Sequence, residues 1–391
     1  MRPGNSIAEP RHRRHKHAGM SLPPTIQSVW VRKRRRKEGA AWPKIASMWR
    51  CFLTSLLCFA VSPLLAQEPA PSSASPQSSP GARAKESSPL RRPWMMDADK
   101  VHDPSTIIGM DGVHRFFSTG PGVTLMRENS EGRWQPEGRL FAEGGLPQWH
   151  NELVPGNRGY LWAPDIIRIG ASYFVYYSVS TFGTNVSAIG LAAGRSLDPK
   201  SPDWKWEDRG PVLKSRAGDG FNAIDPAVFH DEANGRLWMT FGSFWDGIFL
   251  VELDPKTGRR REPESPPLCL AHAPEIEAPL LHKRDGKYYL FVNWGKCCRG
   301  TNSTYEIRVG RSDKVTGPFL DQSGKDMREG GGTLLLASAD EFIGLGHASL
   351  LHRDGQEWLA HHYYAKSLGG RSRLRLVGVT WDASGWPRVQ P

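Results

Sequence analysis

The stretch IEAPLLHKRDGKYYLFVNW, residues 276–294, contains an acidic residue, a short apolar run, an Asp-Gly turn and an aromatic-rich run. Asp-Gly between two runs of strand-forming residues is a strong signal for a two-residue β-hairpin. Glu277 stands directly before the apolar run, where a charged residue is unusual. The stretch therefore predicts a hairpin that carries a carboxylate at the start of its first strand.

The same order of features occurs in four other segments of the chain. They are HDPSTIIGMDGVHRFFSTG (102–120), WAPDIIRIGASYFVYYSVS (162–180), IDPAVFHDEANGRLWMTFGSFW (224–245) and GHASLLHRDGQEWLAHHYY (346–364). The turn glycines are Gly112, Gly170, Gly235, Gly286 and Gly355, at intervals of 58, 65, 51 and 69 residues. Third strands are predicted after most copies, at 187–196, 247–253, 306–312 and 374–381.

Strand-rich units that recur at this period stack radially as propeller blades. Five units predict an all-β fold, a five-bladed β-propeller, over residues 93–391. A β-sandwich would have a similar strand content, but the ordered recurrence of one four-part unit favours the propeller.

In a propeller the first strand of each blade lines the central channel. Counting back from the turn glycines gives five equivalent positions, Asp103, Trp162, Asp225, Glu277 and His347. We therefore expect these side chains to converge on one pocket near the axis. Asp165 falls three residues past the second-blade position and is out of this register.

Three carboxylates in one pocket cannot all ionise cheaply, because repulsion and desolvation raise the pKa of at least one of them. A neutral carboxylic acid opposite an ionised carboxylate is what glycosidic bond hydrolysis requires. Groups about 6.5–9.5 Å apart leave room for a water, which predicts an inverting mechanism. Asp before Pro also commonly begins a turn or strand, so Asp103 and Asp225 each have a purely structural alternative.

The segments resemble glycoside hydrolase family 43, and most closely its endo-α-1,5-L-arabinanases. The resemblance covers roughly residues 98–390 and rests on HDPS, FSTGPG, LWAPDI, YYSVSTFGTNVSAIGLA, NAIDPAVF, FGSFW, IEAPLL, CCRGTNSTYEIRVGRS, GKDMREGGGTLLL and WDASGWPRV. Carried onto matching positions, it makes Asp103 the general base, Glu277 the general acid, and Asp225 the residue that orients the acid and tunes its pKa.

The resemblance also implies a calcium or other cation in the central channel, held through His347 largely by waters, and no organic cofactor. The sequence departs from the family stretch around His347, where it reads GLGHA. The alternative is a channel histidine that hydrogen-bonds a carboxylate without a metal. Trp162, Phe244 and Trp245 are candidate sugar platforms, because flat aromatic faces suit furanose rings. Asn222 and Ser243 are candidate hydrogen-bonding partners of the sugar.

The implied function is cleavage of internal α-1,5 links of arabinan, a side chain of pectin, with inversion. One alternative is an exo-acting arabinofuranosidase, exo-arabinanase or β-xylosidase on the same fold. Another is a non-catalytic sugar-binding propeller, against which the three intact carboxylates argue. A monomer is expected.

The basic charge of the chain lies at its N-terminus. Residues 1–50 contain 13 of the 51 Lys and Arg residues and 2 of the 40 Asp and Glu residues, which leaves 38 of each sign in the remainder. The net charge of +11 is therefore no argument for nucleic-acid binding by the folded part.

Residues 1–66 read as a basic leader and a secretory signal peptide, with the apolar run after Arg50, cleavage at Ala66 and Met48 or Met20 as alternative starts. A membrane anchor is the alternative, but the run is short for a span. Residues 67–92 are rich in Pro and Ser and predict a disordered linker. We expect a secreted or periplasmic protein without a membrane span once the signal is removed.

Signal removal would leave Cys269 and the adjacent pair Cys297 and Cys298. An odd number implies no simple disulfide framework. The adjacent pair predicts either a vicinal disulfide or two free thiols.

Overall fold

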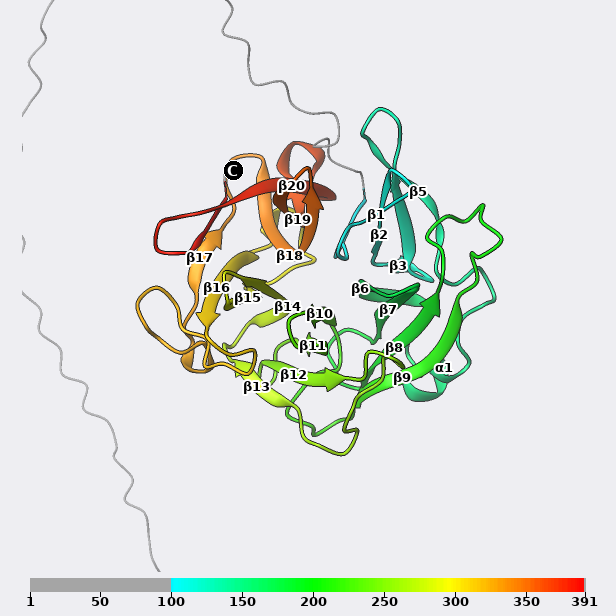
Figure 1. The fold of residues 1–391 in the computed structure, drawn as a ribbon, viewed down its shortest axis with the longest axis horizontal. Helices are drawn as coiled ribbons and strands as arrows, with labels where there is room; N and C mark the ends of the chain where they lie inside the picture. The colour runs from blue at the N-terminus through cyan, green and yellow to red at the C-terminus, as the bar shows by residue number, and fades with distance from the viewer. Residues whose placement is uncertain (1–99, 390–391) are drawn as a thin grey trace, which may run out of the picture. The chain divides into compact units, whose positions relative to one another are not determined.

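The computed structural model describes residues 100–389, and the predicted leader, signal peptide and linker lie outside the described residues. The described chain is built almost entirely of strands, which form five antiparallel sheets around a central axis (Figure 1). The five-bladed β-propeller predicted from the repeat is confirmed.

Each blade has four main strands that follow one another in the chain. Blade one consists of β1 (Ile108–Met110), β2 (Val113–Ser118), β4 (Thr124–Glu128) and β5 (Trp134–Arg139). Blade two consists of β6 (Tyr160–Ile169), β7 (Ser172–Val179), β8 (Ser187–Gly194) and β9 (Glu207–Ser215), with the short β3 (Gly120–Pro121) added beside β6. Blade three consists of β10 (Ala227–Asp231), β11 (Arg236–Phe241), β12 (Ile248–Leu253) and β13 (Leu268–Ala271).

The last two blades complete the ring. Blade four consists of β14 (Ile276–Arg284), β15 (Lys287–Trp294), β16 (Glu306–Ser312) and β17 (Thr333–Leu336). Blade five consists of β18 (Phe342–Arg353), β19 (Gln356–Ala365), β20 (Arg371–Trp381) and β21 (Pro387–Val389). The short helical segments in the described range are α1 (Trp149–Leu153), η2 (Gly300–Asn302), η3 (Met327–Glu329) and η4 (Lys366–Leu368). In the part of the chain that the structure describes, none of the helices has the length and apolarity of a membrane span.

The first hairpin of most blades has the predicted two-residue turn. In blade four, Arg284 pairs with Lys287 across Asp285 and Gly286, and both turn residues have positive φ. This is the backbone that a type I′ turn requires and that Asp-Gly adopts readily. Blade three is the exception, since Asp231 pairs with Arg236 and the Asn-Gly pair closes a four-residue loop. Asn-Gly also favours a two-residue hairpin, and the structure shows that this expectation is wrong for blade three.

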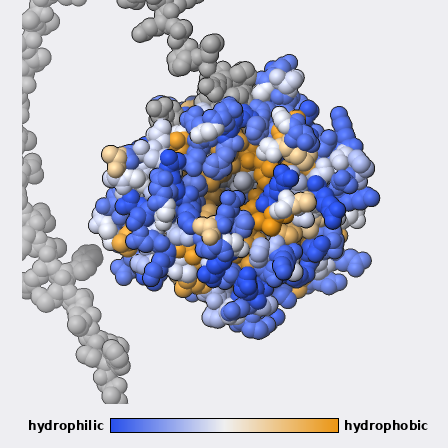
Figure 2. All heavy atoms as spheres, in the orientation of Figure 1, coloured by the Kyte–Doolittle hydropathy of each residue, from blue (hydrophilic) through white to orange (hydrophobic). Residues whose placement is uncertain are grey.

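Hydrophobic side chains fill the spaces between neighbouring blades. Five core clusters lie between blades one and two, two and three, three and four, four and five, and five and one. Each sheet therefore buries both faces, because each is packed between two others. On the face shown in Figure 2, hydrophobic residues gather around the centre and hydrophilic residues cover the rim.

The ring is closed by contacts between the first and last blades, without a strand exchanged between them. Ile107 forms a parallel bridge with Leu351, and its N–H donates to the carbonyl of Leu350 at 2.8 Å. Phe116 and Trp134 of blade one pack with residues of blade five in one cluster. Hydrophobic burial and a few backbone hydrogen bonds therefore hold the two ends of the propeller together.

All five blades bend at one point close to the axis. A residue with positive φ stands there in each blade, and four of the five precede a proline: Asp103, Ala163, Asp225, Ala278 and His347. The next residues of the five blades line one narrow axial cavity of about 10 Å³: Pro104, Pro164, Pro226, Pro279 and Ala348. The blades therefore meet at the axis, and His347 is the one of the five side chains predicted to converge there that lines this cavity.

The register counted from the turn glycines is wrong by one residue in two blades. The backbone position equivalent to Asp103 and Asp225 is Ala163 in blade two and Ala278 in blade four. Trp162 and Glu277 each stand one residue earlier. The number of residues between this bend and the turn glycine differs from blade to blade, so a count from the glycine does not find the same position in all of them. The inner strands contain a register shift at the bend in blades two, four and five. Such bulges redirect side chains and are frequent beside active sites.

Candidate active site

Asp103 lies at the centre of a cluster of polar side chains from blades one and five. Its Oδ2 accepts a hydrogen bond from Thr119 Oγ1 at 2.5 Å and lies 2.8 Å from Nδ1 of His102. Its Oδ1 lies 3.3 Å from Nδ1 of His347 and 3.4 Å from Nδ1 of His362. Thr119 and His102 are potential donors to Oδ2 and His347 is one to Oδ1, whereas Nδ1 of His362 accepts the backbone N–H of Asp103.

The surroundings of Asp103 strongly favour its ionised form. Burial alone would raise the pKa of this carboxyl, but the nearby His102, His347 and His362 together lower it far below its usual range. The ionised carboxylate carries a lone pair that can accept a proton from water, and its lowered pKa makes it a weaker base than an exposed aspartate.

Glu277 has the opposite character. It is buried, and its Oε2 accepts a hydrogen bond from Ser243 Oγ at 2.6 Å while Oε1 accepts one from the hydroxyl of Tyr305. Burial raises the pKa of Glu277, and the charge of Asp103 raises it further, against the opposing effect of the two hydroxyl donors. Glu277 therefore holds its proton to higher pH than an exposed glutamate.

Asp225 belongs to the same electrostatic group. Its N–H donates to Ser178 Oγ at 3.0 Å, and its Oδ2 accepts from the N–H of Ala278 at 3.2 Å. Burial raises its pKa well above the usual value, followed by repulsion from Glu277 and Asp103. Asp225 thus binds the backbone directly after Glu277, and the two carboxyls titrate as an interacting pair.

The site therefore contains one carboxylate with a depressed pKa and two carboxyls with raised pKa values. Environments that push carboxyl pKa values apart separate a base from an acid. The arrangement can take a proton from water at Asp103 and deliver one from the Asp225 and Glu277 pair.

Asp165, which the repeat placed out of register, has a different role. Its Oδ1 accepts from the N–H of Thr106 at 2.9 Å and its Oδ2 from the N–H of Val228 at 2.8 Å. One carboxylate of blade two thus binds the backbones of blades one and three. Because both oxygens are occupied by backbone groups, Asp165 connects the inner strands.

His347, the predicted cation ligand, is buried beside the axial cavity and faces Asp103 through Nδ1. Its N–H donates to Asn293 Oδ1 at 2.8 Å, which fixes its backbone. An imidazole beside a carboxylate is compatible with both alternatives, a histidine that hydrogen-bonds Asp103 and one that helps to hold a cation. A cation would find one imidazole and few free oxygens in the cavity wall, so hard-cation coordination there would depend on waters.

The three predicted aromatic platforms differ in exposure. Trp245 is 40% exposed, whereas Trp162 and Phe244 are half-buried. Phe182, which sequence reasoning missed, is 79% exposed, and its ring centroid lies 4.8 Å from that of Trp162. A phenylalanine this exposed beside a tryptophan forms an apolar surface that a sugar ring could cover.

The two predicted hydrogen-bonding residues are both buried. Ser243 gives its hydroxyl proton to Glu277 and so contacts the carboxyl directly. Asn222 is 3% exposed, and within residues 100–389 its Oδ1 has no hydrogen-bond partner. An unpaired buried amide oxygen is uncommon in folded proteins.

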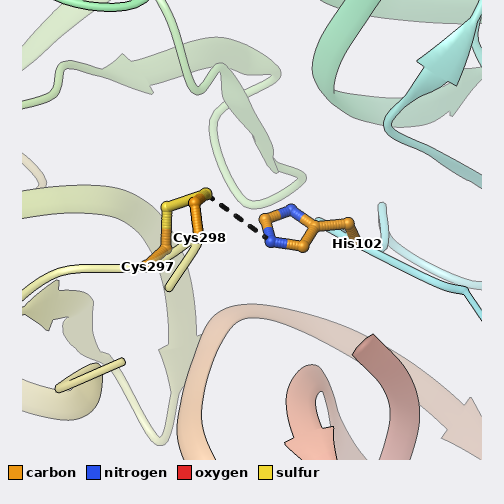
Figure 3. A group of neighbouring side chains, drawn as sticks. All are labelled: His102, Cys297 and Cys298. Carbon is orange, nitrogen blue, oxygen red and sulfur yellow. Dashed lines mark hydrogen bonds between the residues drawn. A yellow bond between two sulfur atoms is a disulfide. The ribbon is translucent and has the colours of Figure 1, made fainter. Parts of the chain in front are cut away.

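Cys297 and Cys298 form a vicinal disulfide in the loop between β15 and β16, and Cys269 is a free thiol. The structure thereby decides between the two states that the sequence left open. Figure 3 shows the disulfide beside His102, with Cys298 Sγ 3.8 Å from Nε2 of the imidazole.

Sequence reasoning missed most of the groups that contact the carboxylates: His102, Thr119, Ser178, Tyr305 and His362. His102 and His362 stood inside the repeated segments, directly before Asp103 and near the end of the fifth copy. Tyr305 lies outside the repeat. Its contact with Glu277 arises because the loop before β16 packs against the start of β14.

A family model for glycosyl hydrolases family 43 matches residues 98–387. The chain belongs to glycosyl hydrolase family 43. The match spans nearly all of the described propeller, and the protein is therefore a glycosidase. The family resemblance stated from the sequence motifs is confirmed.

Two relatives illustrate the range of activities for which similar proteins are named. The extracellular exo-α-(1→5)-L-arabinofuranosidase ArbA of Cellvibrio japonicus is 41% identical over 303 residues, which cover 74% of this chain and 86% of that protein. The extracellular endo-α-(1→5)-L-arabinanase 1 of Bacillus subtilis is 37% identical over 304 residues, which cover 75% of this chain and 89% of that protein.

Solved structures of family members share the fold. An exo-1,5-α-L-arabinanase from a bovine ruminal metagenomic library matches with a TM-score of 0.71 and 42% identity, covering 76% of this chain and 98% of that one. The native arabinanase Arb43A of Bacillus subtilis matches with a TM-score of 0.67 and 35% identity, covering 75% and 99%.

Proposed function

We propose that this protein is an inverting hydrolase that cleaves internal α-1,5-L-arabinofuranosidic bonds of arabinan, the pectin side chain. The observation that carries the proposal is the opposite electrostatic character of Asp103 and Glu277 in one buried site. Support for the substrate comes from the relatives, which are named for action on α-1,5-linked arabinofuranose.

In this mechanism Asp103 is the general base. Its ionised carboxylate takes a proton from a water as the oxygen of that water attacks the anomeric carbon. Hydrogen bonds from Thr119 and the adjacent imidazoles leave the carboxylate oriented before substrate arrives.

Glu277 is the general acid and gives its proton to the leaving glycosidic oxygen. Ser243 and Tyr305 fix the two carboxyl oxygens. Asp225 accepts a hydrogen bond from the N–H of Ala278, and its pKa is raised, as is that of Glu277. We assign Asp225 the role of orienting Glu277 and keeping it protonated.

The proposed sugar platforms are Trp245, Phe244 and the pair formed by Trp162 and Phe182. Asn222 is a proposed hydrogen-bonding partner of the sugar. An internal cut requires sugar rings on both sides of the bond. Exposed aromatic side chains on blade two and after β11 in blade three offer more than one such surface.

Exo action is the second candidate, and a specific observation favours it. Both the 41% identical relative and the 42% identical solved structure are named for exo activity. The two modes share the same bond chemistry and differ in where along the chain the substrate is cut.

We predict that debranched arabinan yields a mixture of oligosaccharide sizes early in the reaction, with newly formed reducing ends of β configuration. Internal cleavage produces this size range, and a single displacement inverts the α anomer. Chromatography of timed samples together with proton NMR of fresh product measures both. A single short product from the earliest time points would instead establish exo action, and an α product would overturn the inverting mechanism.

A calcium or other cation is proposed in the channel, with His347 and water as ligands. A cation beside Asp103 would supply positive charge that favours the ionised base. We predict that a chelator lowers the melting temperature and that calcium restores it, because a ligand of the native state alone stabilises it. An unchanged melting temperature after exhaustive chelation, verified by metal analysis, would exclude a stabilising cation.

We also propose that the protein is exported. The Cellvibrio japonicus and Bacillus subtilis relatives are named extracellular, and disulfides persist in oxidising compartments. N-terminal sequencing of exported protein tests this expectation by locating the cleavage at or away from Ala66.

A further inference from the structure

The vicinal disulfide borders the site without contacting any of the three carboxyls directly. Cys298 is exposed and Cys297 half-buried, so a reductant in solvent can reach the bond. Figure 3 shows the pair facing His102, which precedes the proposed base in the chain. The contact between Cys298 and His102 has no role in the proposed mechanism of hydrolysis.

A chain of hydrogen bonds connects the disulfide loop to Asp103. The N–H of Cys298 lies 2.7 Å from the hydroxyl oxygen of Tyr364, and that oxygen lies 2.7 Å from Nε2 of His102. Nδ1 of the same imidazole lies 2.8 Å from Oδ2 of Asp103. All of these distances are within ordinary hydrogen-bond range.

The chain has a direction, because a backbone N–H can only donate. The Tyr364 oxygen accepts from Cys298, and it also hydrogen-bonds the Ser303 side chain, whose oxygen already accepts from the N–H of Arg299. The phenol proton is then directed to Nε2 of His102. The imidazole proton therefore resides on Nδ1, where it is donated to Asp103.

His102 is further fixed by stacking. Its ring lies 3.9 Å from that of His362 at an interplanar angle of 22°. Nδ1 of His362 accepts the backbone N–H of Asp103 at 3.2 Å. The stacked imidazoles thus hold both the backbone and the carboxylate of Asp103.

The disulfide holds Cys298 in a conformation that residues with a side chain rarely adopt, with φ at +66°. The bond closes a small ring across the Cys297–Cys298 peptide and limits its rotation. Once the bond is broken, Cys298 is free to return to negative φ. Its N–H would then turn away from Tyr364.

We propose that the Cys297–Cys298 disulfide, Tyr364 and His102 form a positioning relay that orients the carboxylate of Asp103, and that reduction of the disulfide lowers kcat. In the reduction, a dithiol gives two electrons and two protons. The S–S bond breaks, Cys297 and Cys298 become thiols, and the dithiol closes to its own disulfide. The proposal rests on the assignment of Asp103 as the base.

The kinetic test uses Tyr364→Phe, which removes the hydroxyl and keeps the ring. We expect kcat on α-1,5-arabino-oligosaccharides to fall about tenfold, the effect of one lost hydrogen bond in the transition state, with KM nearly unchanged. Tyr176→Phe is the matched control, since it removes another buried phenol that donates to Gly258 at 2.6 Å. Equal effects of the two variants on kcat would overturn the relay.

The redox arm compares oxidised and dithiol-treated wild type with the double variant Cys297→Ser, Cys298→Ser. We expect reduction to lower the wild-type kcat about tenfold and reoxidation to restore it. The double variant should have the lower kcat and not respond to the dithiol. A double variant with full wild-type kcat would overturn the role of the disulfide.

A spectroscopic arm is independent of activity. Nitrogen NMR of the His102 side chain in mildly alkaline buffer, assigned with a His102→Gln variant, is expected to show the proton on Nδ1. Tyr364→Phe or reduction should shift this resonance. A proton on Nε2 in the oxidised protein would overturn the relay even if the enzyme were active. If the NMR signature is as expected but the enzyme is inactive on every pentose glycoside, the proposed function is overturned instead.

Discussion

Glu277→Gln is expected to lower kcat on arabino-oligosaccharides by about 10²- to 10⁴-fold, the usual contribution of a general acid. The glutamine keeps the size of the side chain, and its carbonyl oxygen can still accept from one of Ser243 and Tyr305, while its NH2 group faces the oxygen of the other. What it lacks is the transferable proton. Steady-state kinetics on oligosaccharides of defined length measure the loss.

The leaving group provides the discriminating control. An aryl arabinofuranoside with a strongly acidic phenol departs without protonation, so the same variant should lose much less activity on it. Glu275→Gln is the matched variant, because Glu275 lies two residues away and pairs with Lys296 near the surface. An equal loss of activity of Glu277→Gln on both substrates would show that Glu277 is not the acid.

The pH dependence has a definite sign. Because the pKa of Glu277 is raised, the acid is protonated below that pKa, and activity falls as pH rises through it. The pKa of Asp103 is lowered, so loss of the base occurs only in strong acid. We therefore expect the alkaline fall in wild-type activity to vanish in Glu277→Gln.

Asp103→Asn is expected to lower kcat to a similar degree, about 10²- to 10⁴-fold, and by the same factor for poor and good leaving groups. The asparagine has a carbonyl oxygen in place of one carboxylate oxygen but cannot accept a proton from water. Steady-state kinetics on oligosaccharides and on the activated aryl arabinofuranoside measure the decrease in kcat on each substrate.

Asp111→Asn is the control for the removal of one negative charge from the same blade. Asp111 occupies the exposed first turn with positive φ, which asparagine tolerates. Substantial residual activity of Asp103→Asn on both substrates would show that another group is the general base. If Asp103→Asn lost activity on oligosaccharides but kept it on the activated aryl arabinofuranoside, Asp103 would be the general acid.

Much of the architecture could be predicted from the repeated segments. Asp-Gly turns between two apolar runs are local signals, and their recurrence identified the blades before any contact was known. The four-residue loop at Asn234 and Gly235 was not predictable in this way. Turn length there depends on how β10 and β11 pair, which dipeptide preference does not determine.

The site was only partly predictable. Asp103, Asp225 and Glu277 stood out because they share a place in the repeat, but the backbone equivalent of Asp103 and Asp225 in blade four is Ala278, one residue after Glu277. A count from the turn glycine cannot fix this position, because the number of residues between the bend and the turn differs among the blades. Tyr305 and Phe182 lie outside the repeated pattern, although both fall within motifs that carry the family resemblance, CCRGTNSTYEIRVGRS and YYSVSTFGTNVSAIGLA.

The sequence by itself determined the five-fold repeat, the family and the three acidic residues of the site, because each depends on residue types at short chain separation. The tertiary structure decided the opposite pKa shifts of the carboxyls. The pKa of Asp103 is lowered by His102, its neighbour in the chain, and by His347 and His362, which reach it from blade five, more than 240 residues away. Burial and the charge of Asp103 raise the pKa of Glu277. Charge and burial act through space, so these shifts are complete only when the blades close into a ring.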